Sequence, residues 1–143
     1  MNANELMIGD LLKWKEQPGF NDEDRNMVLR VRNIFDDVIK IDGRFEPYHI
    51  SLFEPIPLTP EILEKSGFVA NKHVYPYPYY EYEVKEIKVK VGFAFPQGNK
   101  TSYKEPWVYI DSECVFVEHL PCMFVHQLQH AFRLCGIEKE IVL

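Results

Sequence analysis

Short apolar runs separated by turn-forming residues fill the first part of the chain. Over residues 27–32, apolar and polar side chains alternate, which is the period of a strand with one buried face. Asp42-Gly43 is typical of a tight β-hairpin, and Pro47 indicates an edge strand or a bulge. Five short strands are expected, at residues 11–15, 27–32, 38–41, 44–50 and 52–56. With one long polar loop after the first strand, they predict a small SH3-like β-barrel over residues 1–57.

The second part, residues 58–143, combines helical and strand patterns. Thr59 suits an N-cap, Pro60 suits the first helical position and Gly67 suits a stop, so a helix is expected over residues 60–66. A second helix is expected between Pro121 and Gly136, and a turn at 96–99. Strands are expected at 80–84, 87–91, 107–110, 114–118 and 138–143. This pattern predicts an α+β unit packed against the barrel, and an α+β chain as a whole.

Composition and charge narrow the class of protein. The chain of 143 residues is 46% hydrophobic and 27% charged, which is typical of a folded globular protein. A net charge of −6 argues against a dedicated nucleic-acid binder, because phosphate contacts need clustered Lys and Arg. No apolar run approaches the ~20 residues of a membrane span, and the start lacks the features of a secretory signal. Three cysteines without C-x-x-C spacing favour a reduced intracellular protein. Together these features predict a cytoplasmic protein without membrane association.

Two histidines, His126 and His130, lie four residues apart on the predicted C-terminal helix. This spacing is half of a zinc site, and Cys122 lies one turn earlier, with His119 close in sequence. The zinc-protease signature has Glu where this chain has Gln127, and an amide cannot act as the general base. We therefore expect no metal, cofactor or catalytic residue. A metal-dependent hydrolase at His126, His130 and Cys122 is the alternative, and elemental analysis of the purified protein tests it.

The helical periodicity places the histidines away from the expected core. With Leu128 at the centre of the apolar face, five residues fall within about 60° of it. They are Phe124, Val125, Ala131, Phe132 and Cys135. The opposite side carries Met123, His126, His130 and Leu134, which we call the histidine ridge. Because a solvated face is normally charged, we expect this ridge to be an interface, at least half buried against the barrel or a second copy. A homodimer is the commonest way to cover such a patch.

Cysteine offers a further candidate chemistry. Cys114 and Cys122 could act as nucleophiles with His119 or His126 as the base. Their neighbours are apolar, which favours buried and unreactive thiols.

Tyrosine and lysine are concentrated in the strands expected before and after Lys85-Glu86, where the alternation changes phase and indicates a bulge or a tight bend. The tyrosines are Tyr75, Tyr77, Tyr79, Tyr80 and Tyr82, and the lysines are Lys85, Lys88 and Lys90. A single-stranded nucleic acid could stack its bases on Tyr80 and Tyr82, while Lys88 and Lys90 neutralise its phosphates. A tyrosine-rich strand with a lysine-bearing solvent face is the favoured interpretation.

Three segments carry a resemblance to a known family. They are "NELMIGDLL" at residues 4–12, "PIPLTPEILEKSGF" at 55–68 and "VHQLQHAFRLCGI" at 125–137. In this order they resemble a family of short proteins of phages, prophages and other mobile elements of gut-type bacteria. Many members of that family have Asn where this chain has His130, which weakens the zinc interpretation further. The resemblance implies no activity, substrate or catalytic residue.

The expected function is that of a non-enzymatic accessory or interaction protein of a mobile element, with an unidentified protein partner. A nucleic-acid-binding module that uses the barrel and the Lys88/Lys90 strand is the main alternative. A mobility-shift assay at low and moderate salt separates the two, because phosphate-driven binding weakens steeply with salt.

Overall fold

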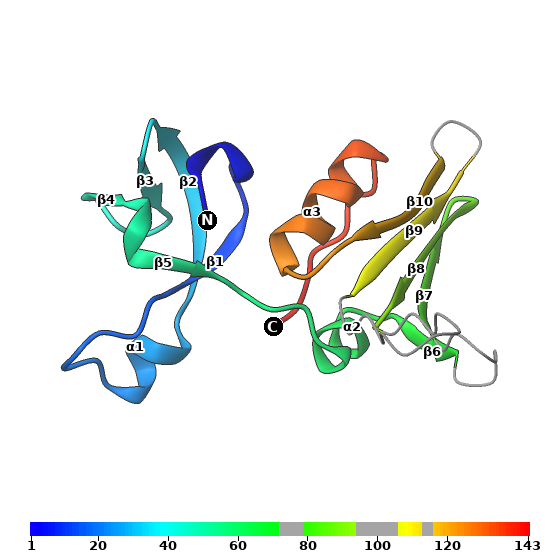
Figure 1. Cartoon of the computed structure of the whole chain (residues 1–143), viewed down its shortest axis with the longest axis horizontal. Helices are drawn as coiled ribbons and strands as arrows, with labels where there is room; N and C mark the ends of the chain where they lie inside the picture. The colour runs from blue at the N-terminus through cyan, green and yellow to red at the C-terminus, as the bar shows by residue number, and fades with distance from the viewer. Residues whose placement is uncertain (72–78, 94–105, 113–115) are drawn as a thin grey trace, which may run out of the picture. The chain divides into compact units, whose positions relative to one another are not determined.

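The chain has an α+β fold with two antiparallel five-stranded sheets, which confirms the expected fold class. The structure is a computed structural model (Figure 1), and it describes residues 1–71, 79–93, 106–112 and 116–143, with the backbone alone for 116–119. The chain divides into two compact units, Met1–Ile56 and Pro57–Leu143. In the described part, the longest apolar helix falls short of the length needed to cross a membrane.

The first unit is a sheet of short strands in the order β4-β3-β2-β1-β5. Its elements are the 3-10 helices Ala3–Glu5 and Ile50–Leu52, the helix α1 (Asp22–Asn26), and the strands β1 (Leu11–Trp14), β2 (Val28–Phe35), β3 (Val38–Ile41), β4 (Pro47–His49) and β5 (Phe53–Pro55). All residues of this unit are described, and within it β4 and β5 each pair with a single neighbour. The sheet is therefore open, and closure into an SH3-like barrel is not confirmed. Pro47 stands on the edge strand β4, as expected for a residue without an N–H.

The core of the first unit lies on one face of this sheet. In β2, Leu29 and Val31 are buried, whereas Val28 is 46% exposed, so the predicted alternation is confirmed. Across the β2–β3 ladder, Ile39 and Ile41 are also buried. This apolar layer holds the strands together, because burying such side chains contributes roughly 1.5–3 kcal/mol each.

The tight hairpin of the first unit is not at the predicted position. Strands β2 and β3 are joined by Asp36-Asp37, with Asp36 at a φ of 47° and Phe35 paired with Val38. The predicted turn Asp42-Gly43 does bend the chain, with Gly43 at a φ of 75°, but residues 42–46 separate β3 from β4. The predicted hairpin is therefore confirmed, because β3 and β4 pair antiparallel across this loop, but the prediction that its turn is tight is wrong. Asp tolerates the left-handed conformation better than most residues, which allows Asp36 to replace Gly.

The second unit is a meander covered by helices. Its sheet has the order β10-β9-β8-β7-β6, with every described pair antiparallel. The strands are β6 (Val69–Asn71), β7 (Tyr79–Val84), β8 (Ile87–Gly92), β9 (Trp107–Asp111) and β10 (Phe116–Pro121), and the helices are α2 (Pro60–Lys65) and α3 (Val125–Leu134). Helix α3 lies along one face of the sheet (Figure 1), where Phe132 packs against Phe68 and against Tyr82 of β7. The predicted turn at 96–99 and the start of the predicted strand at 114–118 lie outside the described residues.

The short helix α2 forms as its sequence predicts. The Thr59 hydroxyl accepts a hydrogen bond from the Ile62 N–H at 3.4 Å, and Pro60 occupies the first turn. Gly67 has a φ of 84° and ends the helix in the left-handed conformation. Leu63 is fully buried and anchors α2 in the core.

Helix α3 begins four residues later than predicted. Pro121 is the last residue of β10, and the helix starts at Val125. The Gln127 side-chain oxygen accepts hydrogen bonds from the N–H groups of Met123 (2.8 Å) and Phe124 (3.1 Å). Gln127 thus satisfies backbone donors at the start of the helix, in the manner of a capping box.

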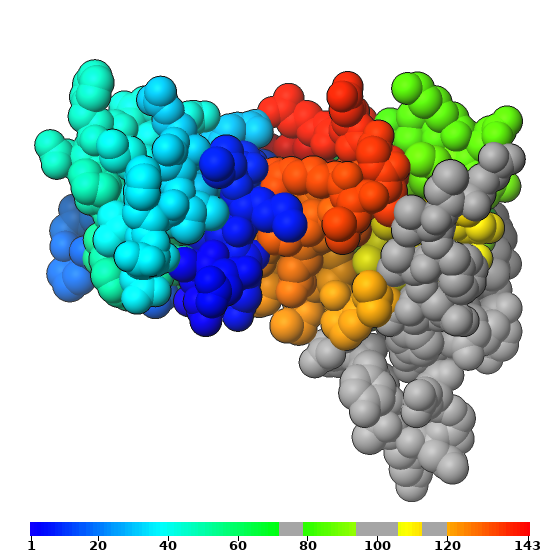
Figure 2. Space-filling view, turned by 90° about the horizontal axis from the view of Figure 1, so that it is seen from above, coloured from blue at the N-terminus to red at the C-terminus, as the bar shows by residue number. Residues whose placement is uncertain are grey.

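The C-terminal residues do not form the predicted strand. Residues 138–143 have no regular secondary structure, and they lie next to α3 in Figure 2, where they are red and α3 is orange. Ile141 is buried, and the Val142 N–H donates to the Ser66 hydroxyl at 2.9 Å. Side-chain burial and a hydrogen bond to Ser66, rather than a sheet ladder, hold this segment.

Residues Lys85-Glu86 form the second tight hairpin, between β7 and β8. The strand ends Val84 and Ile87 pair directly, and Lys85 and Glu86 have φ of 47° and 67°. The predicted tight bend is therefore confirmed. Two left-handed residues in succession are the geometry of a type I′ turn, which favours Asn and Gly over Lys and Glu.

We expect Glu86→Gly to stabilise the second unit. The left-handed conformation costs a residue with a Cβ about 1–2 kcal/mol, and glycine removes this cost. Part of the gain is lost because glycine also has greater freedom in the unfolded chain. The free energy of unfolding should therefore rise by roughly 0.5–1 kcal/mol in urea titrations. The matched control is Glu83→Gly within β7, which should lower it by roughly 0.5–1 kcal/mol. A loss of stability for Glu86→Gly would show that the turn is not strained.

Candidate functional site

The histidine ridge is only partly buried. His126 is 3% exposed and His130 is half-buried, whereas Met123 and Leu134 are 37% and 75% exposed. The two imidazole rings lie 5.6 Å apart between centroids, and His126 stacks on Phe124 at 5.8 Å. Within a single chain Leu134 is therefore not half buried, and its expected burial stays a prediction that requires a second copy. Leu134 is the last residue of α3 and, like its neighbour Arg133, is exposed.

The candidate metal ligands of the described ranges do not form a complete metal site, although His126 and His130 are neighbours. Zinc needs three or four ligands, and in the described ranges no three side chains of His, Cys, Asp or Glu form such a group. The side chain of His119 lies outside these ranges, as does Cys114. Gln127, which stands where zinc proteases have Glu, is used in capping α3. These two capping hydrogen bonds give a structural reason for a glutamine at position 127.

Cys122 is a poor nucleophile. Its side chain is 1% exposed, and burial raises the pKa of the thiol to about 12. Burial also raises the pKa of the Cys135 thiol. A thiol with this pKa is protonated at neutral pH, and because the thiolate is the reactive form, burial makes Cys122 a weak nucleophile.

The raised pKa of Cys122 predicts a loss of stability in alkali. Below pH 9 the thiol is protonated in both states, so its contribution to stability is fully present there. Between pH 9 and about 12 only the unfolded chain releases the proton, so stability falls as pH rises. Urea titrations at pH 8 and pH 10.5 should show this fall, at most about 1.4 kcal/mol per pH unit. Cys122→Ala should reduce the difference, and an unchanged difference would contradict the assignment.

The predicted grouping of Tyr80 and Tyr82 with Lys88 and Lys90 is wrong. The β7–β8 register places Tyr80 opposite Val91 and Glu81 opposite Lys90. Neighbours across strands share a face, so Tyr80 and Tyr82 lie on the helix-covered face and both lysines lie on the other. Tyr82 packs against Phe68 and Phe132, at 5.4 and 6.4 Å between ring centroids.

Tyr80 also has a local structural partner. Its hydroxyl donates to the Glu64 carboxylate of α2 at 3.3 Å. Desolvation, and then the negative charge of Glu64, raise the pKa of the Tyr80 hydroxyl. Tyr80 therefore joins α2 to the sheet.

On the opposite face of the sheet, the lysines lie beside tyrosine rings and acidic side chains. The Lys90 ammonium lies 4.9 Å from the centroid of the Tyr79 ring, 5.5 Å from that of Tyr109, and 4.0 Å from the Glu81 carboxylate. Lys88 stands opposite Glu83 on β7 and Asp111 on β9. This face thus carries Glu81, Glu83 and Asp111 beside its two lysines, a balance that does not attract phosphate. Tyr75 and Tyr77 lie outside the described residues.

An aromatic surface in the first unit was not foreseen from the sequence. Trp14 of β1 stacks on buried Phe53 at 4.6 Å and meets Tyr48 and Phe20 edge to face at 5.2 and 6.4 Å. Trp14, Phe20 and Tyr48, which we call the aromatic surface, are all partly exposed. They come from β1, the β1–β2 connection and β4, so no local pattern links them. Their grouping depends on the order of the strands.

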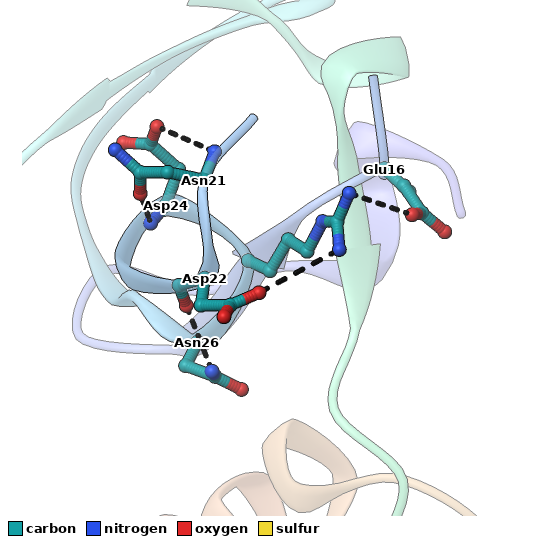
Figure 3. Close-up of polar contacts among 6 residues, drawn as sticks. Glu16, Asn21, Asp22, Asp24 and Asn26 are labelled. Carbon is teal, nitrogen blue, oxygen red and sulfur yellow. Dashed lines mark hydrogen bonds and ion pairs between the residues drawn. The ribbon is translucent and has the colours of Figure 1, made fainter. Parts of the chain in front are cut away.

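An acidic loop, residues 16–26, adjoins the aromatic surface and contains Phe20. Its second half forms α1, because Asn21 accepts from the Asp24 N–H at 2.8 Å and Asp24 in turn accepts from the Asn21 N–H at 3.4 Å (Figure 3). The Arg25 guanidinium lies 3.5 Å from the Glu16 carboxylate and 3.6 Å from that of Asp22 (Figure 3). Because these groups are exposed, the ion pairs contribute little to stability.

Known proteins offer no functional comparison. The chain matches no protein-family model, and no curated protein or solved structure is significantly similar to it. In the described part of the chain, the aromatic surface and the acidic loop bring partly exposed rings and exposed charge together at one place.

Proposed function

We propose that the chain is a non-enzymatic accessory protein of a phage or other mobile element, which binds a partner protein through its aromatic surface. The mobile-element context is supported by the resemblance of the segments at 4–12, 55–68 and 125–137. The interaction role is supported by one structural observation. Trp14 and its partners Phe20 and Tyr48 remain partly exposed although they are large and apolar.

The stacking of these rings suits recognition. Trp14 is fixed against Phe53, which is 1% exposed, and Tyr48 also meets Phe53 at 6.3 Å. Rings held in this way lose little conformational entropy when a partner covers them. Tyrosine and tryptophan are enriched among the residues that supply most of the free energy of binding at interfaces.

The two alternative functions have weaker support. A metal-dependent hydrolase needs a general base, and Gln127 instead caps α3. A nucleic-acid module needs unmatched positive charge, whereas Lys90 lies beside Glu81 and Lys88 stands opposite Glu83 and Asp111.

Site-specific cross-linking tests the proposal. A photo-reactive amino acid is placed at position 20 of the full chain, which is expressed in cells that carry the mobile element. Position 83, exposed on β7 of the second unit, is the matched control. We expect one defined protein adduct from position 20 and none of the same mass from position 83. Adducts common to both positions, or none from position 20, would overturn the proposed function.

A further inference from the structure

We infer that the aromatic surface takes a positively charged, arginine-containing segment of the partner protein. This inference rests on the proposed function, because it names the chemistry of the partner at the same surface. The charge of the chain is unevenly distributed. Residues 1–56 hold eleven acidic and seven basic side chains, a net charge of −4 out of the −6 of the chain.

Of the two lysines that flank Trp14, Lys13 is paired with the Glu54 carboxylate at 3.0 Å and Lys15 is exposed, and the acidic loop follows directly. Within the acidic loop, four carboxylates stand against the single guanidinium of Arg25, a net charge of −3 over residues 16–26. The loop starts two residues after Trp14 and carries Phe20 against it. A ligand that covers the rings is therefore placed within reach of these carboxylates.

The acidic loop already binds one guanidinium, that of its own Arg25. Arg25 lies between the carboxylates of Glu16 and Asp22, whose side chains are 76% and 94% exposed. Glu23, exposed on the same helix, takes part in neither ion pair. Carboxylate groups on this loop thus remain open to a second cation.

Arginine fits both parts of the surface better than other cations do. Its planar guanidinium stacks on aromatic faces and forms paired hydrogen bonds with carboxylates. The partly exposed rings of the aromatic surface supply the aromatic partner, and Asp22 and Glu23 supply the carboxylates. A nucleic acid or an anionic lipid surface is repelled by the same charges, so the geometry points to a basic protein segment.

Titration of the isotopically labelled full chain tests the inference. The probe is a capped ten-residue peptide with four arginines among glycine, serine and leucine, and the control peptide has citrulline in place of each arginine. Citrulline keeps the shape of arginine and removes its charge. We expect saturable shifts of the Trp14 indole N–H and of the amides of residues 16–26 with the arginine peptide alone.

Variants locate the binding. Asp22→Lys with Glu23→Lys should weaken the Kd of the arginine peptide by roughly tenfold or more, since two attractive charges become repulsive. Phe20→Ser should also weaken it, whereas Glu83→Lys with Glu86→Lys in the second unit should leave it unchanged. Thermal melts confirm that each variant folds. Equal binding of the citrulline peptide, or an equal loss in the second-unit variant, overturns the inference.

The two proposals fail in different ways. An adduct from position 20 together with no preference for the arginine peptide leaves the proposed function standing and rejects the basic partner. Absence of the adduct rejects the proposed function, whatever the peptide does.

Discussion

Phe132→Ala should lower the free energy of unfolding of the second unit by about 3–5 kcal/mol, the usual cost of removing a buried aromatic ring. Phe132 is 1% exposed and lies in α3 against the sheet. Its ring stacks on Phe68 at 6.2 Å and meets Tyr82 at 6.4 Å. Alanine leaves a cavity between α3, β7 and the segment after α2, because backbone elements cannot close a gap of this size. Urea unfolding followed by circular dichroism measures the loss.

Leu134→Ala is the matched control, two residues along the same helix. Leu134 is 75% exposed, so its replacement should change the free energy of unfolding of the single chain by less than about 0.5 kcal/mol. A larger loss that depends on protein concentration would instead identify Leu134 as covered by a second copy, as the histidine ridge predicts. A small effect of Phe132→Ala would contradict the packing of α3 on the sheet.

Gly92→Ala should lower the free energy of unfolding by about 1–3 kcal/mol, the typical cost of overpacking. Gly92 stands in β8 directly opposite Trp107 of β9, and the Trp107 indole lies over its Cα. A Cβ at position 92 would overlap the Trp107 ring. Trp107 is 5% exposed, and β8 and β9 are both held within the sheet, so the ring cannot turn aside without disturbing its surroundings.

A double-mutant cycle separates this overlap from a general preference for glycine. In a Trp107→Ala background the ring is absent, and Gly92→Ala should cost nothing or give a small gain from the lower entropy of the unfolded chain. A penalty of equal size in both backgrounds would show that the cost comes from the backbone at position 92.

Local signals in the sequence predicted most of the elements. The helix at 60–66 follows from Thr59, Pro60 and Gly67, each of which acts on atoms within a few residues. The strand Val38–Ile41 follows in the same way from a short, mainly apolar run. The predicted start of α3 at Pro121 was wrong because a proline at the end of an edge strand and one at the start of a helix look alike in sequence.

The candidate sites were less predictable. Tyr80 and Lys90 lie in adjacent tyrosine- and lysine-rich strands, yet the register puts them on opposite faces of the sheet. A two-residue turn at Lys85-Glu86 fixes that register, and a single extra residue there would exchange the faces. The alternation was visible in the sequence, but the pairing partner of each residue was not.

The sequence by itself determined the α+β class, the caps of α2 and the buried face of β2, because these depend on residues close together in the chain. Only the tertiary structure decided that Trp14, Phe20 and Tyr48 share one surface beside an acidic loop. These rings are up to 34 residues apart, and the strand order β4-β3-β2-β1-β5 and the fold of the β1–β2 connection bring them together. Contacts of that span depend on which strands pair, and strand pairing is set by the packing of the whole unit.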